Sequence, residues 1–264
     1  MLIATAFVRE NLQEGANWTV NSKISQLIEI LQDSNNIVFF GGAGVSTESG
    51  IPDFRSADGL YSESYSYPPE VILSRSFFEE HTEEFYRFYR EKMLYPDAKP
   101  NKAHMALAEL EKQDKLMAVI TQNVDGLHTS AGSTNVFELH GSALRNLCMS
   151  CNAVYPLEKV IQSVNIPLCT CGGIIKPDVV LYEESLDQMV MTKAIKAINT
   201  ADVLIVGGTS LNVYPAAGMI DYYRGDSLVL INKSKTAYDR YADLVINESI
   251  GATLSEALEA LDSN

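Results

Sequence analysis

A glycine-rich segment near the start of this 264-residue chain has residue types that bind phosphate groups. It reads GGAGVSTESGIPDFR over residues 41–55 and follows a short apolar run. Gly42 and Gly44 fit the first two glycines of the G-x-G-x-x-G turn that cradles a dinucleotide, but Thr47 stands at the third. The strand that should then carry a ribose-binding acid is replaced by a segment rich in Ser, Tyr and Pro, roughly residues 57–70. The sequence therefore predicts a dinucleotide-like ligand that is not bound for hydride exchange.

Three polar residues follow two further predicted strands. Asn123 and Asp125 lie in TQNVDGLH, and His140 lies in VFELHGS. Because ligands of an open parallel sheet bind outside the carboxyl ends of its strands, we expect these side chains to share one crevice with Gly42 and Gly44. A histidine, with an ordinary pKa of roughly 6.5, can act as a general base at neutral pH. The alternatives are a surface histidine, and turn or helix-cap roles for Asn123 and Asp125.

Two more strand ends carry polar groups. The segment LIVGGTSLNVYPAA (204–217) places Thr209 and Ser210 beside a glycine turn, and LVLINKS (228–234) ends a strand in Asn232 and Lys233. Backbone N–H groups and hydroxyls of this kind suit a phosphate or a ribose. Each segment alone could be an ordinary tight turn, but together they outline an elongated ligand such as a dinucleotide.

The four cysteines of the chain follow the pattern C-x2-C-x17-C-x-C, at Cys148, Cys151, Cys169 and Cys171. Two close pairs of thiolates can complete a tetrahedron around zinc, and a site with four protein ligands leaves no position for a catalytic water. The alternatives are two disulfides or four free thiols. The pattern favours a structural zinc ion, although the second pair is shorter than the usual C-x2-C.

Composition and charge limit the partners. The chain is 46% hydrophobic with a formal net charge of −14, so it has no basic surplus to release counterions from nucleic acid. Electrostatic attraction favours binding of a basic partner, such as a lysine-bearing protein segment, over binding of nucleic acid. The start of the chain lacks signal-peptide features, and no apolar run reaches the roughly 18 residues of a membrane span. We therefore expect a cytoplasmic protein that binds neither nucleic acid nor membranes.

Short apolar runs alternate with helical patterns, which is typical of a parallel sheet covered by helices on both faces. The sequence thus predicts an α/β fold, a doubly wound Rossmann-like sheet, with a small zinc-binding module inserted at residues 148–177. The α/β domain would comprise residues 23–147 and 178–264, after an N-terminal extension at residues 1–22. The predicted strands are Ile37–Phe40, Ala118–Thr121, Val136–Leu139, Val203–Val206, Leu228–Ile231 and Leu244–Ile246, and the predicted helices are Lys23–Leu31, Phe78–Tyr95, Lys102–Lys115 and Leu186–Asn199.

Together these motifs resemble the sirtuins, which are NAD-dependent protein lysine deacylases. The resemblance covers roughly residues 23–262 and rests on ordered blocks: GAGVSTESGIPDFR, TQNVDGLH, ELHG, the cysteine module, KPDVVLYEE, GTSLNVYPAA and LIN. The chain departs from the family pattern at Gly41, in the short second cysteine pair, and in YEE (182–184), where Phe-Gly-Glu is commoner.

The resemblance implies NAD as the cofactor, and nicotinamide and O-acyl-ADP-ribose as products. The acyl-lysine oxygen would attack the ribose carbon as nicotinamide leaves, and His140 would take a proton from a ribose hydroxyl. Asn123 and Asp125 complete the implied catalytic set, with Asp125 bonding the carboxamide. The implied cofactor-binding residues are Gly42, Ala43, Gly44, Ile51, Asp53, Phe54, Arg55, Gln122, Asn123, Asp125, Gly208, Thr209, Ser210, Asn232 and Lys233.

The resemblance also implies a substrate site. Val180, Leu181, Tyr182 and Val213 would flank an acyl-lysine peptide that binds by strand addition. Tyr86 matches the tyrosine of a Tyr-x-x-Arg pair found in sirtuins that prefer succinyl or malonyl groups, but Tyr89 replaces the arginine. We therefore expect Tyr86 and Tyr89 to bound an apolar acyl pocket that favours acetyl.

ADP-ribosyl transfer to a protein and non-catalytic NAD sensing are the alternative functions, and the oligomeric state is not predicted.

Overall fold

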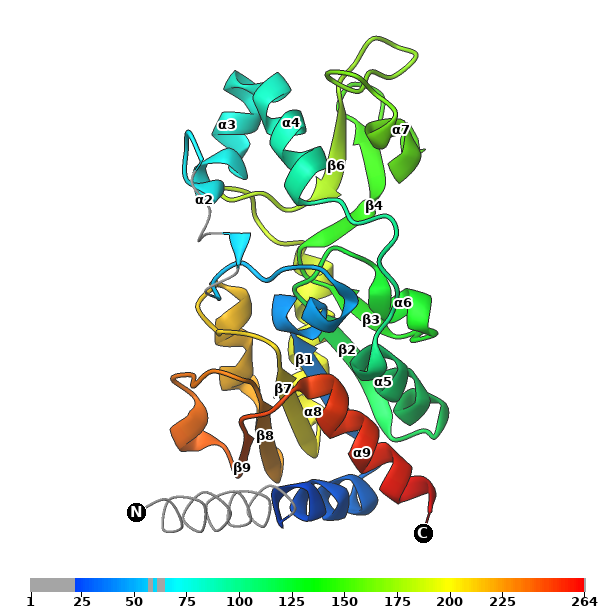
Figure 1. The fold of residues 1–264 in the computed structure, drawn as a ribbon, viewed down its shortest axis with the longest axis vertical. Coiled ribbons are helices and arrows are strands. Elements are labelled where there is room, and N and C mark those ends of the chain that lie inside the picture. The colour runs from blue at the N-terminus through cyan, green and yellow to red at the C-terminus, as the bar shows by residue number, and fades with distance from the viewer. Residues whose placement is uncertain (1–21, 57–58, 61–64, 264) are drawn as a thin grey trace, which may run out of the picture.

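A parallel sheet of six strands forms the centre of the larger lobe in the computed structural model, which describes residues 22–56, 59–60 and 65–263 (Figure 1). The strand order is β3-β2-β1-β7-β8-β9, and each neighbouring pair is parallel. The order reverses at β1, which is the position where doubly wound sheets bind their ligands. The strands are β1 Ile37–Gly41, β2 Leu116–Thr121, β3 Val136–Glu138, β7 Val203–Gly207, β8 Ser227–Ile231 and β9 Leu244–Ile246. All six predicted strands are therefore present, with small differences at their ends.

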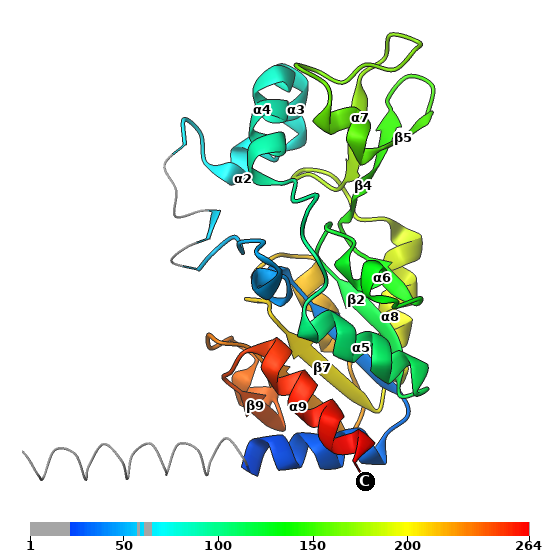
Figure 2. The same ribbon diagram turned by 45° about the vertical axis from the view of Figure 1, so that its right-hand side comes forward.

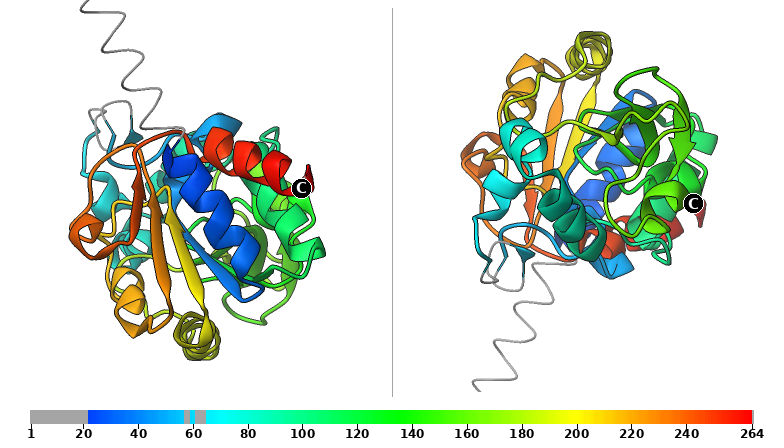
Figure 3. Two further views of the ribbon diagram at one scale, coloured as in Figure 1. Left: turned by 90° about the horizontal axis from the view of Figure 1, so that it is seen from below. Right: turned by 90° about the horizontal axis from the view of Figure 1, so that it is seen from above.

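The sheet is covered on both faces because its strands are apolar throughout. Alternate residues point to opposite faces, so that Phe39 belongs to one hydrophobic cluster and Phe40 to the other. The first cluster packs on the helix at residues 22–33, on α5 (Lys102–Lys112) and on α9 (Ile250–Asp262). The second packs on α8 (Gln188–Thr200) and on a 3₁₀ helix at Ala216–Tyr222. Figure 3 shows these two helical layers on either side of the strands. The doubly wound fold is confirmed.

The predicted helix Phe78–Tyr95 is wrong as a single element. It consists of α3 (Arg75–Glu80) and α4 (Thr82–Lys92), separated at His81, whose φ of −129° and ψ of 44° are not helical. The break brings the rings of Phe78 and Phe85 to 4.9 Å, edge to face. Seven residues of continuous helix would separate their Cα atoms by about 10.5 Å along the axis, so aromatic packing explains the interruption.

The other predicted helices need smaller corrections at their ends. Helix α5 stops at Lys112 because Asp114 adopts a left-handed φ of 55°, and the Lys115 N–H then returns to the Leu110 carbonyl at 3.0 Å. Helix α8 begins after Asp187, whose carboxylate caps two N–H groups of its first turn. The predicted extension at residues 1–22 lies outside the described residues except for residue 22. None of the helices within the described residues is long and apolar enough to cross a membrane.

A second, smaller lobe lies beyond the carboxyl ends of the parallel strands (Figure 2). Its antiparallel sheet has the order β5-β4-β6, formed by β4 Gly141–Cys148, β5 Val154–Pro156 and β6 Ile175–Val179. Helices α3 and α4, with the short α2 (Pro69–Ile72) and α7 (Leu157–Ile161), share one hydrophobic cluster with this sheet. The sheet reaches beyond residues 148–177 on both sides, while the proposed division of the chain into domains remains a prediction.

Candidate active site

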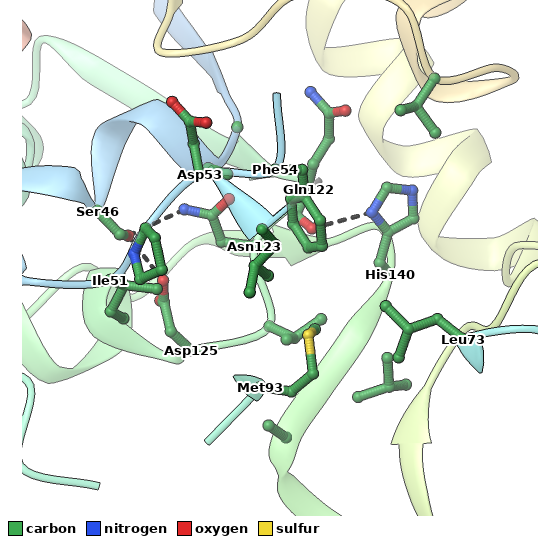
Figure 4. A pocket seen from close by; sticks show the side chains of 18 of the residues that line it. Ser46, Ile51, Asp53, Phe54, Leu73, Met93, Gln122, Asn123, Asp125 and His140 are labelled. Carbon is green, nitrogen blue, oxygen red and sulfur yellow. Dashed lines mark hydrogen bonds between the residues drawn. The ribbon is translucent and has the colours of Figure 1, made fainter. Parts of the chain in front are cut away.

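A cavity of about 860 Å³ lies between the carboxyl edge of the parallel sheet and the smaller lobe. Most of the residues implied for cofactor and substrate line it, and Figure 4 shows several of them, including Asn123, Asp125 and His140, around a common space. Its lining includes, from the implied set, Gly42, Ala43, Gly44, Ile51, Asp53, Phe54, Arg55, Gln122, Asn123, Asp125, His140, Val180, Leu181, Tyr182, Gly208, Thr209, Ser210, Val213 and Asn232.

The two glycine turns contact each other backbone to backbone at the end of β1. The Gly44 N–H donates to the Gly208 carbonyl at 2.8 Å. A Cβ atom on Gly44 would lie 2.8 Å from the Gly208 Cα, and Gly208 itself has a left-handed φ of 59°. Glycine is therefore required at both positions, and this half-buried backbone, here called the glycine floor, carries no side chain that would keep a phosphate at a distance.

Ser46, Asn123 and Asp125 form a hydrogen-bonded group on one side of the cavity (Figure 4). The Ser46 hydroxyl donates to Asp125 Oδ2 at 2.7 Å and accepts from Asn123 Nδ2 at 3.0 Å. Asp125 Oδ1 also accepts the Leu127 N–H at 2.9 Å. Sequence reasoning missed Ser46, although its place two residues after Gly44 was a possible signal. The serine fixes the orientation of the amide and the carboxylate.

His140 is oriented by its other ring nitrogen. Nδ1 lies 2.9 Å from the Gln122 carbonyl oxygen, which can only accept, so Nδ1 carries the proton and Nε2 keeps a free lone pair (Figure 4). Burial lowers the pKa of His140, and the bond to Gln122 offsets this only in part. The imidazole is therefore neutral at pH 7 and has the state that a general base needs.

The opposite end of the cavity has hydroxyl and amide groups. The Gln122 side chain donates to Thr209 Oγ1 at 3.1 Å, which ties β2 to the second glycine turn. Asn232 lines the cavity, but the next lining residues along the chain are Ser234 and Lys235. Lys233 is exposed and is not part of the lining, so its predicted contact with the cofactor is not supported. The local cause is a turn in which Asn232 Nδ2 bonds the Ser234 carbonyl at 2.7 Å.

The predicted acyl-pocket residues Tyr86 and Tyr89 do not line the cavity. Both side chains are completely buried in the smaller lobe, where the Tyr86 hydroxyl donates to the Ile175 carbonyl and the Tyr89 ring stacks on Phe85. This corrects the expectation that they bound the acyl group. Arg90, the next residue of α4, does not line the cavity either. Its guanidinium donates to the Asn165 carbonyl at 2.8 Å.

The four cysteine thiols converge at the tip of the smaller lobe, with all Sγ atoms within 4.8 Å of one another. The closest pairs are separated by 3.5 to 3.6 Å, far longer than a disulfide, and all four cysteines are free. A tetrahedral zinc ion with four thiolate ligands has sulfur–sulfur edges of about 3.8 Å, so the geometry fits this metal. The Tyr155 hydroxyl donates to Cys169 Sγ at 3.0 Å and supports that ligand from outside.

Comparison with known proteins identifies the family to which this chain is similar. Residues 42–215 match the profile of the Sir2 family. A Clostridium acetobutylicum protein named NAD-dependent protein deacetylase is 61% identical over 240 residues, which cover 89% of this chain and 98% of that protein. The chain belongs to the Sir2 family, the sirtuins. The resemblance inferred from the sequence motifs is thus confirmed.

Solved structures similar to this sirtuin are described with a peptide together with NAD⁺ or with an acetylated ADP-ribose. A Sir2 structure described with a p53 peptide and NAD⁺ is 38% identical, with a TM-score of 0.81, and the match covers 90% of this chain and 98% of that one. A Sir2 variant described with a deacetylated p53 peptide and 3′-O-acetyl-ADP-ribose is 39% identical, with a TM-score of 0.82 and the same coverage. The agreement extends over both lobes of this sirtuin.

Proposed function

We propose that this protein is an NAD-dependent lysine deacetylase that moves the acetyl group of a protein lysine onto ADP-ribose. The observation that carries the proposal is the neutral His140, with Nε2 unprotonated in the same cavity as the Ser46–Asn123–Asp125 group. A protein that only senses NAD needs a pocket but has no need of an oriented base. Homologues that carry this activity in their names support the same function.

The residues present fit NAD. The glycine floor at Gly44 and Gly208 suits the phosphates, and Thr209 with Asn232 suits the adenosine side. NAD supplies the ribose carbon to which the acyl oxygen adds and nicotinamide as the leaving group. Asn123 and Asp125 orient the nicotinamide end, held in place by Ser46.

His140 then accepts a proton from a ribose hydroxyl at Nε2, while Nδ1 remains bonded to Gln122. Val180 and Leu181 on one side, and Val213 on the other, provide the edges between which the acyl-lysine peptide lies as an added strand. The four cysteines bind zinc in a structural role, because four thiolates leave no open position for a reacting group.

The direct experiment incubates an acetyl-lysine peptide with NAD and follows peptide and nucleotide by mass spectrometry. Deacetylation requires loss of acetyl from the peptide together with nicotinamide and O-acetyl-ADP-ribose in equal amounts. Retention of acetyl with ADP-ribose on a protein would instead favour the alternative transferase function. Binding of NAD without any product would contradict both.

The proposal extends to the location of the enzyme and to the charge of its protein partners. We place the enzyme in the cytoplasm, because its four free cysteines suit a reducing compartment where a zinc–thiolate site persists. Its net charge of −14 favours basic lysine-bearing protein segments over nucleic acid. Fractionation of cells tests the cytoplasmic location. Comparison of the protein captured by basic acetylated peptides with the protein captured by DNA tests the preference for basic protein segments.

A further inference from the structure

A strained turn follows the cavity-lining residue Val180. The Glu184 N–H donates to the Leu181 carbonyl at 3.0 Å and closes the turn, in which Glu183 has a left-handed φ of 73°. Glycine usually occupies this third turn position, because a Cβ atom makes the left-handed conformation unfavourable. Strain of this kind persists only where surrounding contacts hold it. The Glu183 side chain is therefore the place to look for such contacts.

The Glu183 carboxylate bonds twice to one residue of helix α3. Oε2 accepts the Ser76 N–H at 2.8 Å, and Oε1 accepts the Ser76 hydroxyl at 3.0 Å. Ser76 lies in the first turn of α3, where backbone N–H groups lack partners within the helix and where a negative charge is favourable. The two bonds offset the strain and attach the turn to α3.

The neighbouring residues continue this attachment. The Tyr182 N–H donates to the Leu73 carbonyl, and the Arg75 N–H donates to the Tyr182 carbonyl, both at 3.0 Å. Glu184 accepts from the Arg75 guanidinium at 3.1 Å. Three consecutive residues thus hold the turn against the start of α3, where Tyr182 and Glu183 are exposed and Glu184 is half-buried.

The segment Val180–Glu184, here called the strap, is tied at its other end to the expected base. The Val180 N–H donates to the His140 carbonyl at 3.0 Å. Between these two attachments, Val180 and Leu181 line the cavity. Their position therefore depends on His140 at one end and, at the other, on the Glu183–Ser76 contact together with the bonds of Tyr182 and Glu184, whose carboxylate accepts the Leu181 N–H at 2.8 Å.

We propose that Glu183 is a positioning residue for the acylated substrate. By fixing the strap to α3, its carboxylate holds the Val180–Leu181 edge where the substrate strand pairs. The inference rests on the proposed function, because that function makes this edge the peptide-binding side of the cavity. Glu183 itself belongs to the cavity lining, but both of its carboxylate oxygens are bonded to Ser76, so its contribution is to the position of the peptide-binding edge and not to chemistry.

Three variants and a control test the proposal. Glu183→Gly removes the carboxylate and relieves the strain, Glu183→Ala removes the carboxylate but keeps the strain, and Ser76→Ala removes one of the two donors. Glu79→Gln is the matched control. Glu79 is also a carboxylate bonded to a residue of α3, since it accepts from Arg75 at 2.6 Å, but it is not part of the strap. Binding of a fluorescein-labelled acetyl-lysine peptide gives Kd, and steady-state assays give kcat and the KM values for peptide and NAD.

We expect both Glu183 variants to raise peptide Kd and KM by about fivefold to tenfold, the effect of losing two charge-assisted hydrogen bonds that act indirectly. Ser76→Ala should have a smaller effect, and no additional effect once Glu183 is changed. The value of kcat and the KM for NAD should stay within about twofold of wild type. Glu79→Gln should bind peptide like the wild type.

Several outcomes would overturn the inference. Wild-type peptide affinity in Glu183→Gly would mean that only the shape of the turn matters. Equal losses in kcat and in both KM values would indicate general damage to the fold. If wild-type protein binds the peptide but does not deacetylate it, the proposed function fails while the Kd series still decides the role of Glu183. If it does not bind the peptide at all, both fail.

Discussion

The hydrogen bond from His140 to a backbone carbonyl decides which of its nitrogens can act as a base. The Gln122 carbonyl accepts the Nδ1 proton, and Nε2 is therefore the nitrogen with a free lone pair. A side-chain partner could exchange protons with the imidazole, whereas a carbonyl cannot. The tautomer is therefore fixed by Gln122, which directly follows β2 and precedes the implied carboxamide ligand Asp125 by three residues.

We predict that His140→Ala lowers kcat for deacetylation by about 100-fold to 10,000-fold, which is the usual contribution of a general base. NAD affinity should change by less than about threefold, because the glycine floor and the Ser46–Asn123–Asp125 group are untouched. Steady-state kinetics and calorimetric NAD titration measure the two quantities. A variant that keeps most of its turnover would show that another group takes the proton.

Two further histidines, His104 and His128, are buried against each other with ring centroids 4.7 Å apart. Nδ1 of His104 accepts the Asn101 N–H at 3.2 Å, and neither ring nitrogen of His128 has a partner among the described residues. Burial lowers the pKa of His104, and it lowers the pKa of His128 to about 3. Both rings must therefore stay neutral in the folded protein.

This pair makes stability sensitive to acid. An unfolded histidine has a pKa of about 6.5, so between pH 6.5 and pH 3 the unfolded chain binds protons that folded His128 does not. We expect the free energy of unfolding to fall by about 3 kcal/mol from this residue alone between pH 7 and pH 4. Urea unfolding at several pH values should show a flatter dependence for His128→Phe. An unchanged pH dependence of the free energy of unfolding in His128→Phe would contradict the prediction. The control is His81→Gln, because His81 is exposed and its replacement should leave this pH dependence as in the wild type.

At the scale of elements, the sheet of the smaller lobe depends on its metal site. Strands β4 and β5 flank the first cysteine pair, and β6 follows the second, so the cluster joins the ends of the strands. Among the described residues, the hydrophobic cluster beside it consists of Cys148, Cys169 and Ile175, with Ala153 and Tyr155 packed on it. Such a small cluster contributes little to holding the tip of the lobe, so a crosslink between the cysteines should add substantially to its stability.

We therefore predict one zinc ion per chain and a large loss of stability in Cys169→Ser. Metal analysis after dialysis should give about one equivalent for the wild type and much less for the variant, with a lower Tm. Val164→Ser, at an exposed apolar residue of the same module, is the control and should keep its zinc. A variant that unfolds like the wild type would show that the cysteines do not support the fold.

At the scale of the whole molecule, the cavity exists because two lobes meet above the carboxyl edge of the parallel sheet. Figure 4 places Leu73 of the smaller lobe near His140, and Met93, which follows α4, across the same space. Val179 and Leu181 add further apolar lining on this side. A carboxylate buried among these four apolar side chains would lose its hydration and gain no partner from them.

We predict that kcat/KM for an acetyl-lysine peptide exceeds that for the same peptide carrying succinyl by at least about tenfold, which corresponds to roughly 1.4 kcal/mol. Parallel assays with the two peptides measure the ratio. Arg90→Ala should leave the ratio unchanged, because the guanidinium bonds the loop carbonyl of Asn165 and is not part of the cavity lining. Equal rates for the two peptides, or a ratio that Arg90→Ala alters, would place a cation in the acyl site.

The sequence by itself determined the parallel sheet and the convergence of the polar strand ends. Each strand is a local apolar run, and one rule of topology places the carboxyl ends of parallel strands at a common edge. Asn123, Asp125 and His140 could therefore be placed in one cavity without knowledge of any contact. The cysteine spacing was equally local, since each pair lies within a single turn.

Tertiary structure alone decided which side chains of the smaller lobe reach that cavity. Helical periodicity could not distinguish a pocket from a core, and Tyr86 proved to bond the Ile175 carbonyl, 89 positions along the chain. The bonds of Glu183 to Ser76 likewise join segments distant in sequence. The physical reason is that contacts between segments distant in sequence select one arrangement among several that local patterns allow equally well.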